Sequence, residues 1–347
     1  MLYSHIRRYI PLVAVLIALV TTGGFTSLSA QMATAALDEM DMANRINQLS
    51  RPLADPELTA IKVPELYEGE LEDIGPQFLL LAPPRHKYFQ FLVDMQAYRT
   101  SNATLVPSNF NPGSSDITVA TFQGSVISKP MDTGFGQVQL RAGMRYQFFW
   151  YGLITGRNDQ VSGFPVKDND FNVFTPFVEA LWQKDGWFAT AGVRYLNLYS
   201  PPQSRTTYEE VAPYWIGGYQ FVLSQRDLLL LQYDGNFRFS STKNFGLLPA
   251  GINNRTDQAF SLIYSHLLTD RFIIQPSYRF QYSYYTDSPT SRNDIYNTLG
   301  LLFAYYITDN IAVRVFGNWE NRDSSSRIPS SYRNWNLGGG ANLTFQF

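Results

Sequence analysis

The chain of 347 residues contains no cysteine, only three histidines and few charged residues, which make up 16% of the sequence. The lack of cysteine excludes disulfide bonds and thiolate metal sites, and it gives no indication of the redox compartment. A net charge of −2 is too small to suggest nucleic acid as a partner. The one apolar run that approaches the length of a membrane-spanning helix lies at the N-terminus. Any later segment that enters a membrane must therefore do so as a β-strand.

The N-terminus has the pattern of a secretory signal peptide. Arg7 and Arg8 precede the apolar segment Tyr9 to Val20, and small residues follow it. Cleavage could lie after Ala30 or after Ala35, and Ala35 in A-T-A is the better small-x-small match, so we expect a signal peptide over residues 1–35. The alternative is one transmembrane anchor, but about a dozen apolar residues are fewer than the roughly 20 that a spanning helix needs.

Residues 36–86 differ from the rest of the chain in charge and in proline content. Ten acidic and four basic residues give residues 37–85 a formal charge of −6, and the segment contains six prolines. Met40 to Leu53 could form a short amphipathic helix. We interpret this segment as an acidic periplasmic arm or a plug, with a disordered linker as the alternative.

From residue 87 to residue 347, apolar and polar side chains alternate along the sequence. Between Val138 and Phe148, every even position is apolar, and every odd position is polar or glycine. This period of two predicts β-strands with one apolar and one polar face. Five short turns and six longer polar connections would join twelve strands. The expected strands span residues 87–100, 117–129, 136–150, 171–183, 187–199, 213–223, 228–240, 256–267, 272–285, 295–307, 311–321 and 334–347.

These features predict an all-β fold, a transmembrane antiparallel up-and-down β-barrel of about 12 strands. Each strand is long enough to cross a bilayer when tilted, and an even number of strands leaves both termini on one side. Short turns would then be periplasmic and the longer loops extracellular. A soluble barrel or propeller would show the same alternation. Aromatic residues near strand ends favour the membrane, where such rings suit the headgroup layer; these are Phe149, Trp150, Trp182, Trp187, Tyr199, Tyr284 and Tyr285.

The last fourteen residues, Asn334 to Phe347, alternate without a break and end on an aromatic residue. This tail resembles the C-terminal strand of bacterial outer-membrane β-barrels. The resemblance implies an outer-membrane location among lipid and lipopolysaccharide, with Phe345 and Phe347 as the signal for the outer-membrane assembly machinery. We expect this strand to pair with the first strand near Phe89 to Tyr98, where the glycines 338–340 would allow close approach or bending.

The polar face of the strands carries more arginines than carboxylates, which indicates an aqueous lumen that favours anions. The expected pore-lining residues are Arg141, Arg145, Arg194, Arg238, Arg279, Arg314, Asp94, Glu179, Asp234 and Glu320. The pattern resembles the arginine ladders of porins, and this resemblance implies passive diffusion of small hydrophilic solutes. Alternatively, these charges pair with one another and fill the lumen. The chain would then be a filled or plugged barrel that binds or scaffolds a periplasmic partner.

The sequence does not suggest catalysis. The mature chain has two histidines: His86 precedes the first strand, and His266 shares the parity of apolar residues and should face lipid near a short turn. Neither has a nucleophile nearby in sequence, so we expect no enzyme activity, no cofactor and no metal. The acid-x-acid spacing of Asp168 and Asp170 could bind Ca²⁺, but it is common in solvated loops. The sequence leaves the oligomeric state open, including a homo-oligomer.

Overall fold

The computed structural model describes residues 86–103, 105, 113–161, 164–242, 251–288, 291–326 and 331–347. The predicted signal peptide, and the predicted arm up to residue 85, lie outside these residues. In the part of the chain that the structure describes, no helix has the length and apolarity needed to cross a membrane.

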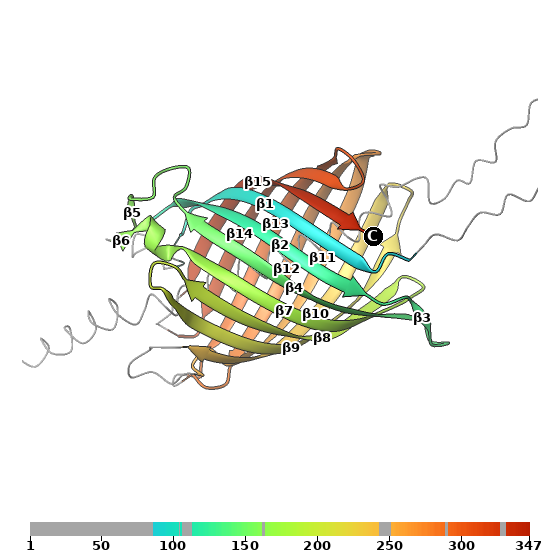
Figure 1. Cartoon of the computed structure of the whole chain (residues 1–347), viewed down its shortest axis with the longest axis horizontal. Coiled ribbons are helices and arrows are strands. Elements are labelled where there is room, and N and C mark those ends of the chain that lie inside the picture. Colours follow the sequence, from blue (N-terminus) through green and yellow to red (C-terminus); the bar gives the residue numbers. More distant parts are fainter. Residues whose placement is uncertain are drawn as a thin grey trace, which may run out of the picture.

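Twelve long antiparallel strands form one continuous sheet that closes on itself (Figure 1). Each strand pairs with its neighbours in the chain, as expected for an up-and-down barrel. The strands are β1 (Phe89–Thr100), β2 (Ser115–Ile127), β4 (Gln137–Tyr151), β7 (Phe171–Lys184), β8 (Trp187–Ser200), β9 (Arg205–Val222), β10 (Asp227–Thr242), β11 (Arg255–Thr269), β12 (Phe272–Tyr285), β13 (Asn293–Tyr306), β14 (Ile311–Ser324) and β15 (Tyr332–Gln346). Short elements in the connections are β3 (Met131–Asp132), β5 (Gln160–Val161), β6 (Phe164–Pro165) and the 3₁₀ turn η4 (Val166–Asn169).

The barrel closes between the first and the last strand, as the sequence predicts. β1 and β15 pair antiparallel from Gln90 opposite Gln346 to Thr100 opposite Asn336. Backbone hydrogen bonds of 2.9 and 3.1 Å between Phe89 and Phe347 continue this ladder to the last residue. Closure gives both edge strands a partner, so no row of unpaired backbone groups meets lipid.

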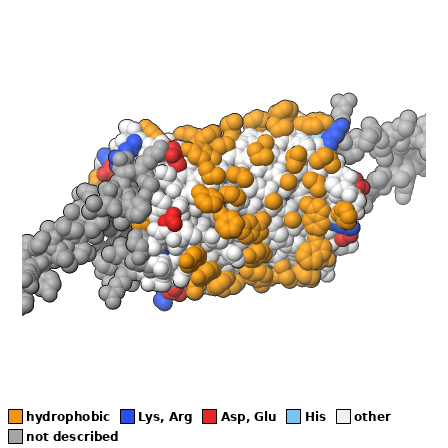
Figure 2. Space-filling view, turned by 90° about the horizontal axis from the view of Figure 1, so that it is seen from below, with side chains coloured by type: hydrophobic (Ala, Val, Ile, Leu, Met, Phe, Trp, Pro, Cys, Tyr) orange, Lys and Arg blue, Asp and Glu red, His pale blue; other side chains and the backbone are white. Residues whose placement is uncertain are grey.

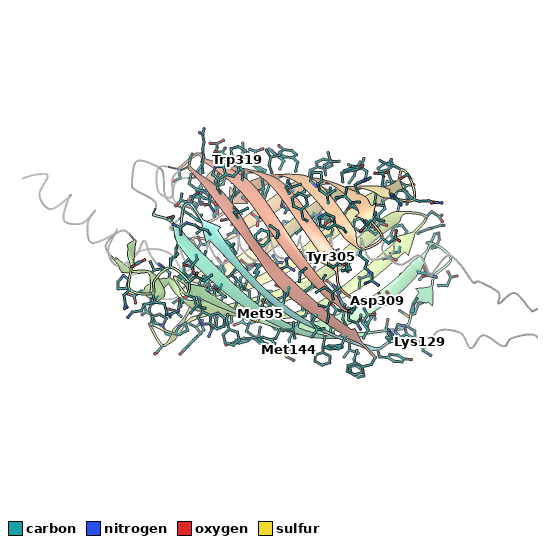
Figure 3. All side chains as sticks on the ribbon, turned by 90° about the horizontal axis from the view of Figure 1, so that it is seen from above. Met95, Lys129, Met144, Tyr305, Asp309 and Trp319 are labelled. Carbon is teal, nitrogen blue, oxygen red and sulfur yellow. The ribbon has the colours of Figure 1, made fainter. Side chains whose placement is uncertain are left out.

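The outer face of the barrel is apolar along every long strand. Phe91, Met95, Phe122, Leu140 and Met144 are between 47% and 59% exposed. Hydrophobic side chains cover the wall between the two ends of the barrel in Figure 2, and Figure 3 shows Met95 and Met144 on its outside. The residues that alternate with them are less exposed and are mostly polar, so they face the lumen. The alternation in the sequence therefore separates a lipid face from a luminal face.

The two ends of the barrel differ in their connections. Residues 185–186, 223–226, 270–271 and 307–310 make short turns at one end, where Lys129 and Asp309 also lie (Figure 3). The C-terminus is at this end, which we call the turn end, and β5 and β6 lie at the opposite loop end (Figure 1).

Two details of the expected fold are wrong. The predicted long loop 200–212 is mostly strand, because β9 begins at Arg205 and only residues 201–204 separate it from β8. Phe149 and Tyr285 do not belong to the lipid-facing aromatic residues, because each is 1% exposed and lies on a luminal position. Trp187 and Tyr199 do face outward, with 56% and 37% of their surface exposed.

Candidate functional site

The strand register places all ten predicted pore-lining residues on luminal positions. Eight of them lie toward the middle or the turn-end half of their strands, and we call them the central belt. Its five arginines and three carboxylates leave a formal excess of two positive charges. The members are Asp94, Arg141, Arg145, Glu179, Arg194, Asp234, Arg279 and Arg314.

Ion pairs connect strands within the belt. Arg141 on β4 pairs with Glu179 on β7, directly opposite in the register. Arg279 on β12 donates two hydrogen bonds of 2.7 Å to Asp234 on β10, across β11. Some luminal charges of the belt therefore pair with one another, as the alternative interpretation of the sequence expects.

Two further belt arginines have an uncharged group among their contacts. The Nε atom of Arg145 donates a hydrogen bond of 2.9 Å to the Oε1 atom of Gln123. The guanidinium of Arg194 lies over the ring of Tyr214 at 5.7 Å from its centroid.

A third ion pair spans the closing seam of the barrel. The Nη1 and Nη2 atoms of Arg314 on β14 donate hydrogen bonds of 2.6 and 2.9 Å to Asp94 on β1. Nη2 also bonds Gln96 at 3.0 Å. Strand β15 lies between these strands and carries Gly340 opposite both Arg314 and Gln96. The missing side chain at Gly340 lets the guanidinium reach across β15.

Nearer the loop end, strands β9 to β14 carry a second group of charges, which we call the charged arc. Arg238 bonds Asp257 at 2.5 Å and Glu210 at 3.3 Å, while Arg255 bonds Asp257 at 3.0 Å. All these side chains are nearly completely buried. Each buried charge therefore has an opposite charge beside it. The remaining members are Arg292 with Asp294, and Arg322 with Glu320.

Tyrosine rings line the same arc. Arg292 and Arg255 lie over the ring of Tyr285, at 4.0 and 5.6 Å from its centroid. Arg322 lies over the ring of Tyr332 at 4.4 Å. Cation–π contacts of this kind add to the ion pairs that hold the arginines in place.

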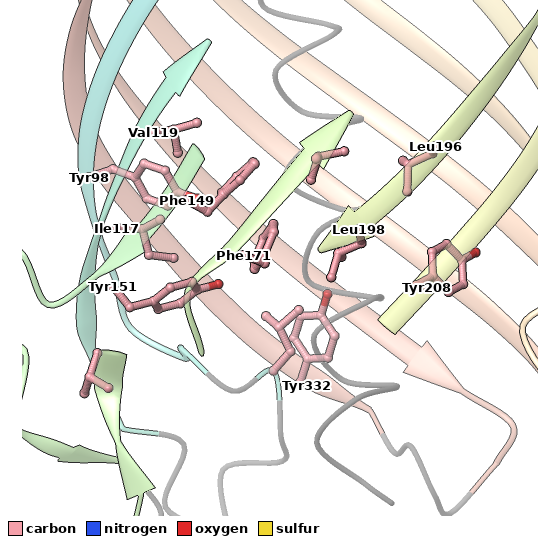
Figure 4. Close-up of a cluster of buried hydrophobic side chains, with 13 residues drawn as sticks. Tyr98, Ile117, Val119, Phe149, Tyr151, Phe171, Leu196, Leu198, Tyr208 and Tyr332 are labelled. Carbon is pink, nitrogen blue, oxygen red and sulfur yellow. The ribbon is translucent and has the colours of Figure 1, made fainter. Parts of the chain in front are cut away.

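The opposite wall of the loop-end lumen is apolar. We call this wall the apolar arc; its buried members come from β1, β2, β4, β7, β8, β9, β15 and two loops (Figure 4). Phe149 and Phe171 stack in it at a centroid distance of 4.3 Å. The members are Tyr98, Leu105, Ile117, Val119, Phe149, Tyr151, Val166, Phe171, Val173, Leu196, Leu198, Tyr208 and Tyr332.

Two tyrosines mark the boundaries between the arcs. Tyr208 and Tyr332 pack in the apolar arc, at the two ends of the strand series that forms it. The hydroxyl of Tyr208 donates to Glu210 at 2.6 Å, and that of Tyr332 donates to Glu320. Each ring therefore has an apolar side and a charged side, so the loop-end lumen is amphipathic across its width.

Leu105 and Val166 of the apolar arc come from the loops that follow β1 and β4. The second loop is anchored by Asp116, which accepts backbone hydrogen bonds of 2.8 Å from Ile154 and 2.9 Å from Thr155. Asp170 accepts the Tyr151 N–H at 2.9 Å and pairs with Arg157.

Burial raises the pKa of the Asp170 carboxyl, while the Tyr151 N–H and Arg157 lower it less strongly. The structure does not support a Ca²⁺ site at Asp168 and Asp170. Among the described residues, no group of three or more His, Cys, Asp or Glu side chains is arranged to hold a metal ion.

Neither histidine of the predicted mature chain occupies a luminal strand position. His86 precedes β1, and its Nε2 atom is 3.2 Å from the carbonyl oxygen of Ile127. His266 shares the outward face of β11 near a short turn, as predicted, and its Nδ1 atom is 2.7 Å from Asp227. Ser224 also bonds Asp227. The carboxylate thus lies between the serine and the imidazole, whereas nucleophile activation needs the imidazole between the other two groups.

Several charged residues of the lumen were not predicted. Glu210, Arg255, Asp257, Arg292, Asp294 and Arg322 all belong to the charged arc. They lie near the loop ends of strands where polar residues occupy both faces, so alternation gives no signal there. A tyrosine two residues away, as beside Glu210 and Asp294, is no recognisable motif either.

Comparisons with known proteins give fold-level matches. No protein-family model matches the chain, and neither does any curated protein. An outer-membrane channel from Pseudomonas putida F1 matches with 9% identity and a TM-score of 0.47, over 75% of this chain and 97% of that chain. The β domain of the Bordetella autotransporter BrkA matches with 13% identity and a TM-score of 0.40, over 74% and 99%. An anion-selective porin from Comamonas acidovorans matches with 8% identity and a TM-score of 0.35, over 75% and 99%. These TM-scores are too low to carry an argument about function.

The fold and surface themselves define the class of the protein. It is a closed antiparallel barrel of twelve long strands with an apolar outer wall and a charged interior. Only such closure satisfies the backbone hydrogen bonds of strands in lipid. The chain therefore has the fold of a bacterial outer-membrane β-barrel, and its outer wall is suited to a lipid environment.

Proposed function

We propose that the protein is an outer-membrane channel for the passive diffusion of small hydrophilic solutes, with a preference for anions. The observation that carries the proposal is the central belt, which holds five arginines and three carboxylates inside a wall of low dielectric constant. Such a wall strengthens the field of an unbalanced charge on a passing ion. Both termini would be periplasmic, with the short turns on that side. The assembly machinery would recognise Phe345 and Phe347, and a homo-oligomer is compatible with the apolar wall.

Planar-bilayer recordings of the purified protein in a potassium chloride gradient test this function. We expect discrete conductance steps and a reversal potential displaced toward that of chloride. The variants Arg145→Gln and Arg145→Glu should reduce this displacement in two successive steps, because they lower the belt charge by one and by two. Arg99→Gln is the matched control, since Arg99 lies at the loop end of β1 and bonds Ser114 outside the lumen. Absence of conductance in pure, folded protein would refute the channel.

Arg→Glu changes at Arg141 and Arg279 should also weaken the anion preference. In these cases the new carboxylate would face Glu179 or Asp234, so the fold must be checked separately. For that reason Arg145, which contacts Gln123, is the sharper position.

A filled or plugged barrel that binds a periplasmic partner is the second candidate. The ion pairs of the belt and of the charged arc favour it, because they place side chains across neighbouring strands inside the lumen. The acidic segment 36–86 would be the plug in this case. Deletion of residues 36–86 separates the two candidates. If the segment plugs the lumen, its loss should raise the conductance. If it only holds a periplasmic partner, its loss should leave the conductance unchanged.

A further inference from the structure

We propose that the outer wall beside the closing seam binds a phosphorylated glycolipid of the outer leaflet through two arginines, Arg99 and Arg333. The inference goes beyond the channel proposal and does not depend on conductance. It rests on the proposed orientation, in which the loop end faces outward, and that orientation has its own test below. Its basis is the combination of exposed arginines and exposed apolar side chains at the loop-end rim of the wall.

Both arginines lie on outward positions of the two strands that close the barrel. Arg99 of β1 shares the parity of the exposed residues Phe91 and Met95, and it lies opposite Leu337 of β15. Arg333 lies four residues before Leu337 on β15, which is two outward positions nearer the loop end. Four residues along a strand and one step between strands separate the two Cα atoms by about 14 Å.

Neither arginine has a carboxylate partner within the described part of the chain. The side chain of Arg99 is exposed and donates a hydrogen bond of 2.9 Å to the Oγ atom of Ser114. Arg333 is exposed as well. A guanidinium stays charged and offers a pair of N–H groups that matches two oxygens of a phosphate. Each of the two side chains is therefore available for a phosphate in the headgroup layer.

Two carboxylates share the outward face near these arginines, and both are bonded to amide groups. Asp116 lies opposite Arg99, but it is 4% exposed and accepts hydrogen bonds from two backbone amides of the loop after β4. Asp323 is exposed and accepts a hydrogen bond of 2.9 Å from Asn321, the residue opposite Arg333. The rim therefore presents two exposed arginines and one exposed carboxylate here, which favours an anionic headgroup.

Large exposed apolar side chains lie beside the arginines. Trp335 and Leu337 are consecutive outward residues of β15, and they are 63% and 67% exposed. The ring of Trp335 lies 6.3 Å from that of Trp319, which Figure 3 shows on the outside of the barrel in its loop-end half. Ile154, which is 70% exposed, is bonded through its amide to the outward Asp116. Indole rings suit the boundary between hydrocarbon and headgroups, so acyl chains and a polar headgroup meet at this level.

These observations fit a lipid that carries two phosphates on one sugar headgroup. Phosphates at the two ends of a disaccharide have a separation comparable to that of Arg99 and Arg333, so each phosphate meets one guanidinium. The sugar then lies over the exposed indole of Trp335, and the acyl chains lie along the apolar wall. A glycerophospholipid has one phosphate and leaves the second arginine without an anion.

Native mass spectrometry of the purified protein in detergent tests the site, because it counts bound lipids at each lipid concentration. The probes are diphosphoryl lipid A, monophosphoryl lipid A and phosphatidylglycerol. We expect diphosphoryl lipid A to bind about fivefold more tightly than the monophosphoryl form, and phosphatidylglycerol to bind more weakly than both. Equal binding of the three lipids, or no binding of diphosphoryl lipid A, would overturn the proposal.

Three variants assign the binding to the two arginines. Arg99→Gln and Arg333→Gln should each weaken diphosphoryl lipid A binding by about fivefold, and the double variant should bind the two forms of lipid A equally. Both side chains are exposed, so circular dichroism should show an unchanged fold. Arg205→Gln is the matched control, because Arg205 is exposed at the loop end of β9, on the opposite side of the barrel in strand order. If the control weakens binding as much as the single variants, the attraction is not specific to the seam.

The lipid site and the channel can fail independently, because the site lies outside the lumen. Bilayers of phosphatidylcholine contain no glycolipid, so Arg99→Gln remains a control for the anion preference of the conductance. Conductance without a preference for diphosphoryl lipid A would overturn the site and leave the channel intact. The preference without conductance would retain the site and refute the channel.

The orientation on which the inference rests is tested in intact cells. The chain has no cysteine, so Gln203→Cys places one thiol in the loop-end connection 201–204. We expect a membrane-impermeant maleimide to label this thiol in intact cells. Labelling only after lysis would place the loop end in the periplasm and would overturn the outer-leaflet lipid as the occupant.

Discussion

Arg314 and Asp94, which are 220 residues apart in the sequence, form a doubly hydrogen-bonded ion pair across the strand that closes the barrel. Their side chains are 4% and 0% exposed. Gly340 of β15 lies opposite Arg314, so the pair passes over a position without a side chain. The seam between the first and last strands is thereby held by backbone bonds and by a luminal ion pair.

Filling the glycine position should destabilise this seam. A Cβ atom at Gly340 would lie 2.6 Å from the Met95 carbonyl oxygen and 2.9 Å from the Gln96 Cβ atom. We expect Gly340→Val to lower the unfolding free energy by about 2–4 kcal/mol, through steric strain and a weakened ion pair. Urea unfolding followed by tryptophan fluorescence measures the change. Gly317→Ala is the control, since its Cβ atom would meet neighbours only at 3.5 Å and beyond. Equal stability of the two variants would contradict the role of the glycine.

Breaking the pair from one side should cost more than removing both charges. Asp94→Asn leaves a buried guanidinium without its carboxylate, so we expect a loss of about 3–5 kcal/mol. The double variant Asp94→Asn with Arg314→Met should be less destabilised than Asp94→Asn alone, because it leaves no unpaired charge. The same urea titration on both variants gives the comparison. A double variant that is additive or worse would show that the charges are not coupled.

The boundary tyrosines should stabilise the barrel through their hydroxyl groups. Tyr208→Phe leaves the Glu210 carboxylate without the bond of 2.6 Å in a buried environment. We expect a loss of about 1–3 kcal/mol. Thermal unfolding followed by circular dichroism measures it, with Tyr146→Phe as a control on the outer face, where the ring is 37% exposed. A loss confined to the control would contradict the assignment.

The loop after β4 should open locally when its anchor is removed. Asp116→Ala deletes the acceptor for the Ile154 and Thr155 amides and for the Thr155 hydroxyl. Hydrogen exchange at these amides should become about ten- to a hundredfold faster, as expected for lost bonds worth about 1–3 kcal/mol. Exchange in β1 and β15 serves as the internal control and should not change. Uniform acceleration over the whole barrel would mean that Asp116 supports the global fold instead.

Alternation predicts the strands well where lipid lies on one side. The expected strand 272–285 coincides with β12, and 136–150 differs from β4 by one residue at each end. In these strands every outward residue must be apolar and most luminal ones are polar, so the period of two is unbroken. The candidate belt residues are predictable for the same reason.

Prediction fails near the loop ends, where the outer face meets headgroups or water instead of hydrocarbon. In β9, Glu209 and Glu210 are consecutive, and in β11 the residues Thr256, Asp257 and Gln258 are all polar. Outward positions there need not be apolar, so the luminal position of Glu210 and Asp257 leaves no pattern. Phe149 presents the converse difficulty, because it lies between Phe148 and Trp150 and residue type alone cannot assign its side.

The sequence by itself determines that this chain forms a barrel of twelve long strands, because only alternate residues face lipid and the turns are spaced accordingly. The tertiary structure decides which luminal charges meet. Arg314 reaches Asp94, and Arg279 reaches Asp234, only because register and a small intervening side chain align strands that are not neighbours. It also gathers apolar residues from seven strands into one wall opposite the arginines. Such side-chain contacts depend on barrel closure, and no local pattern encodes them.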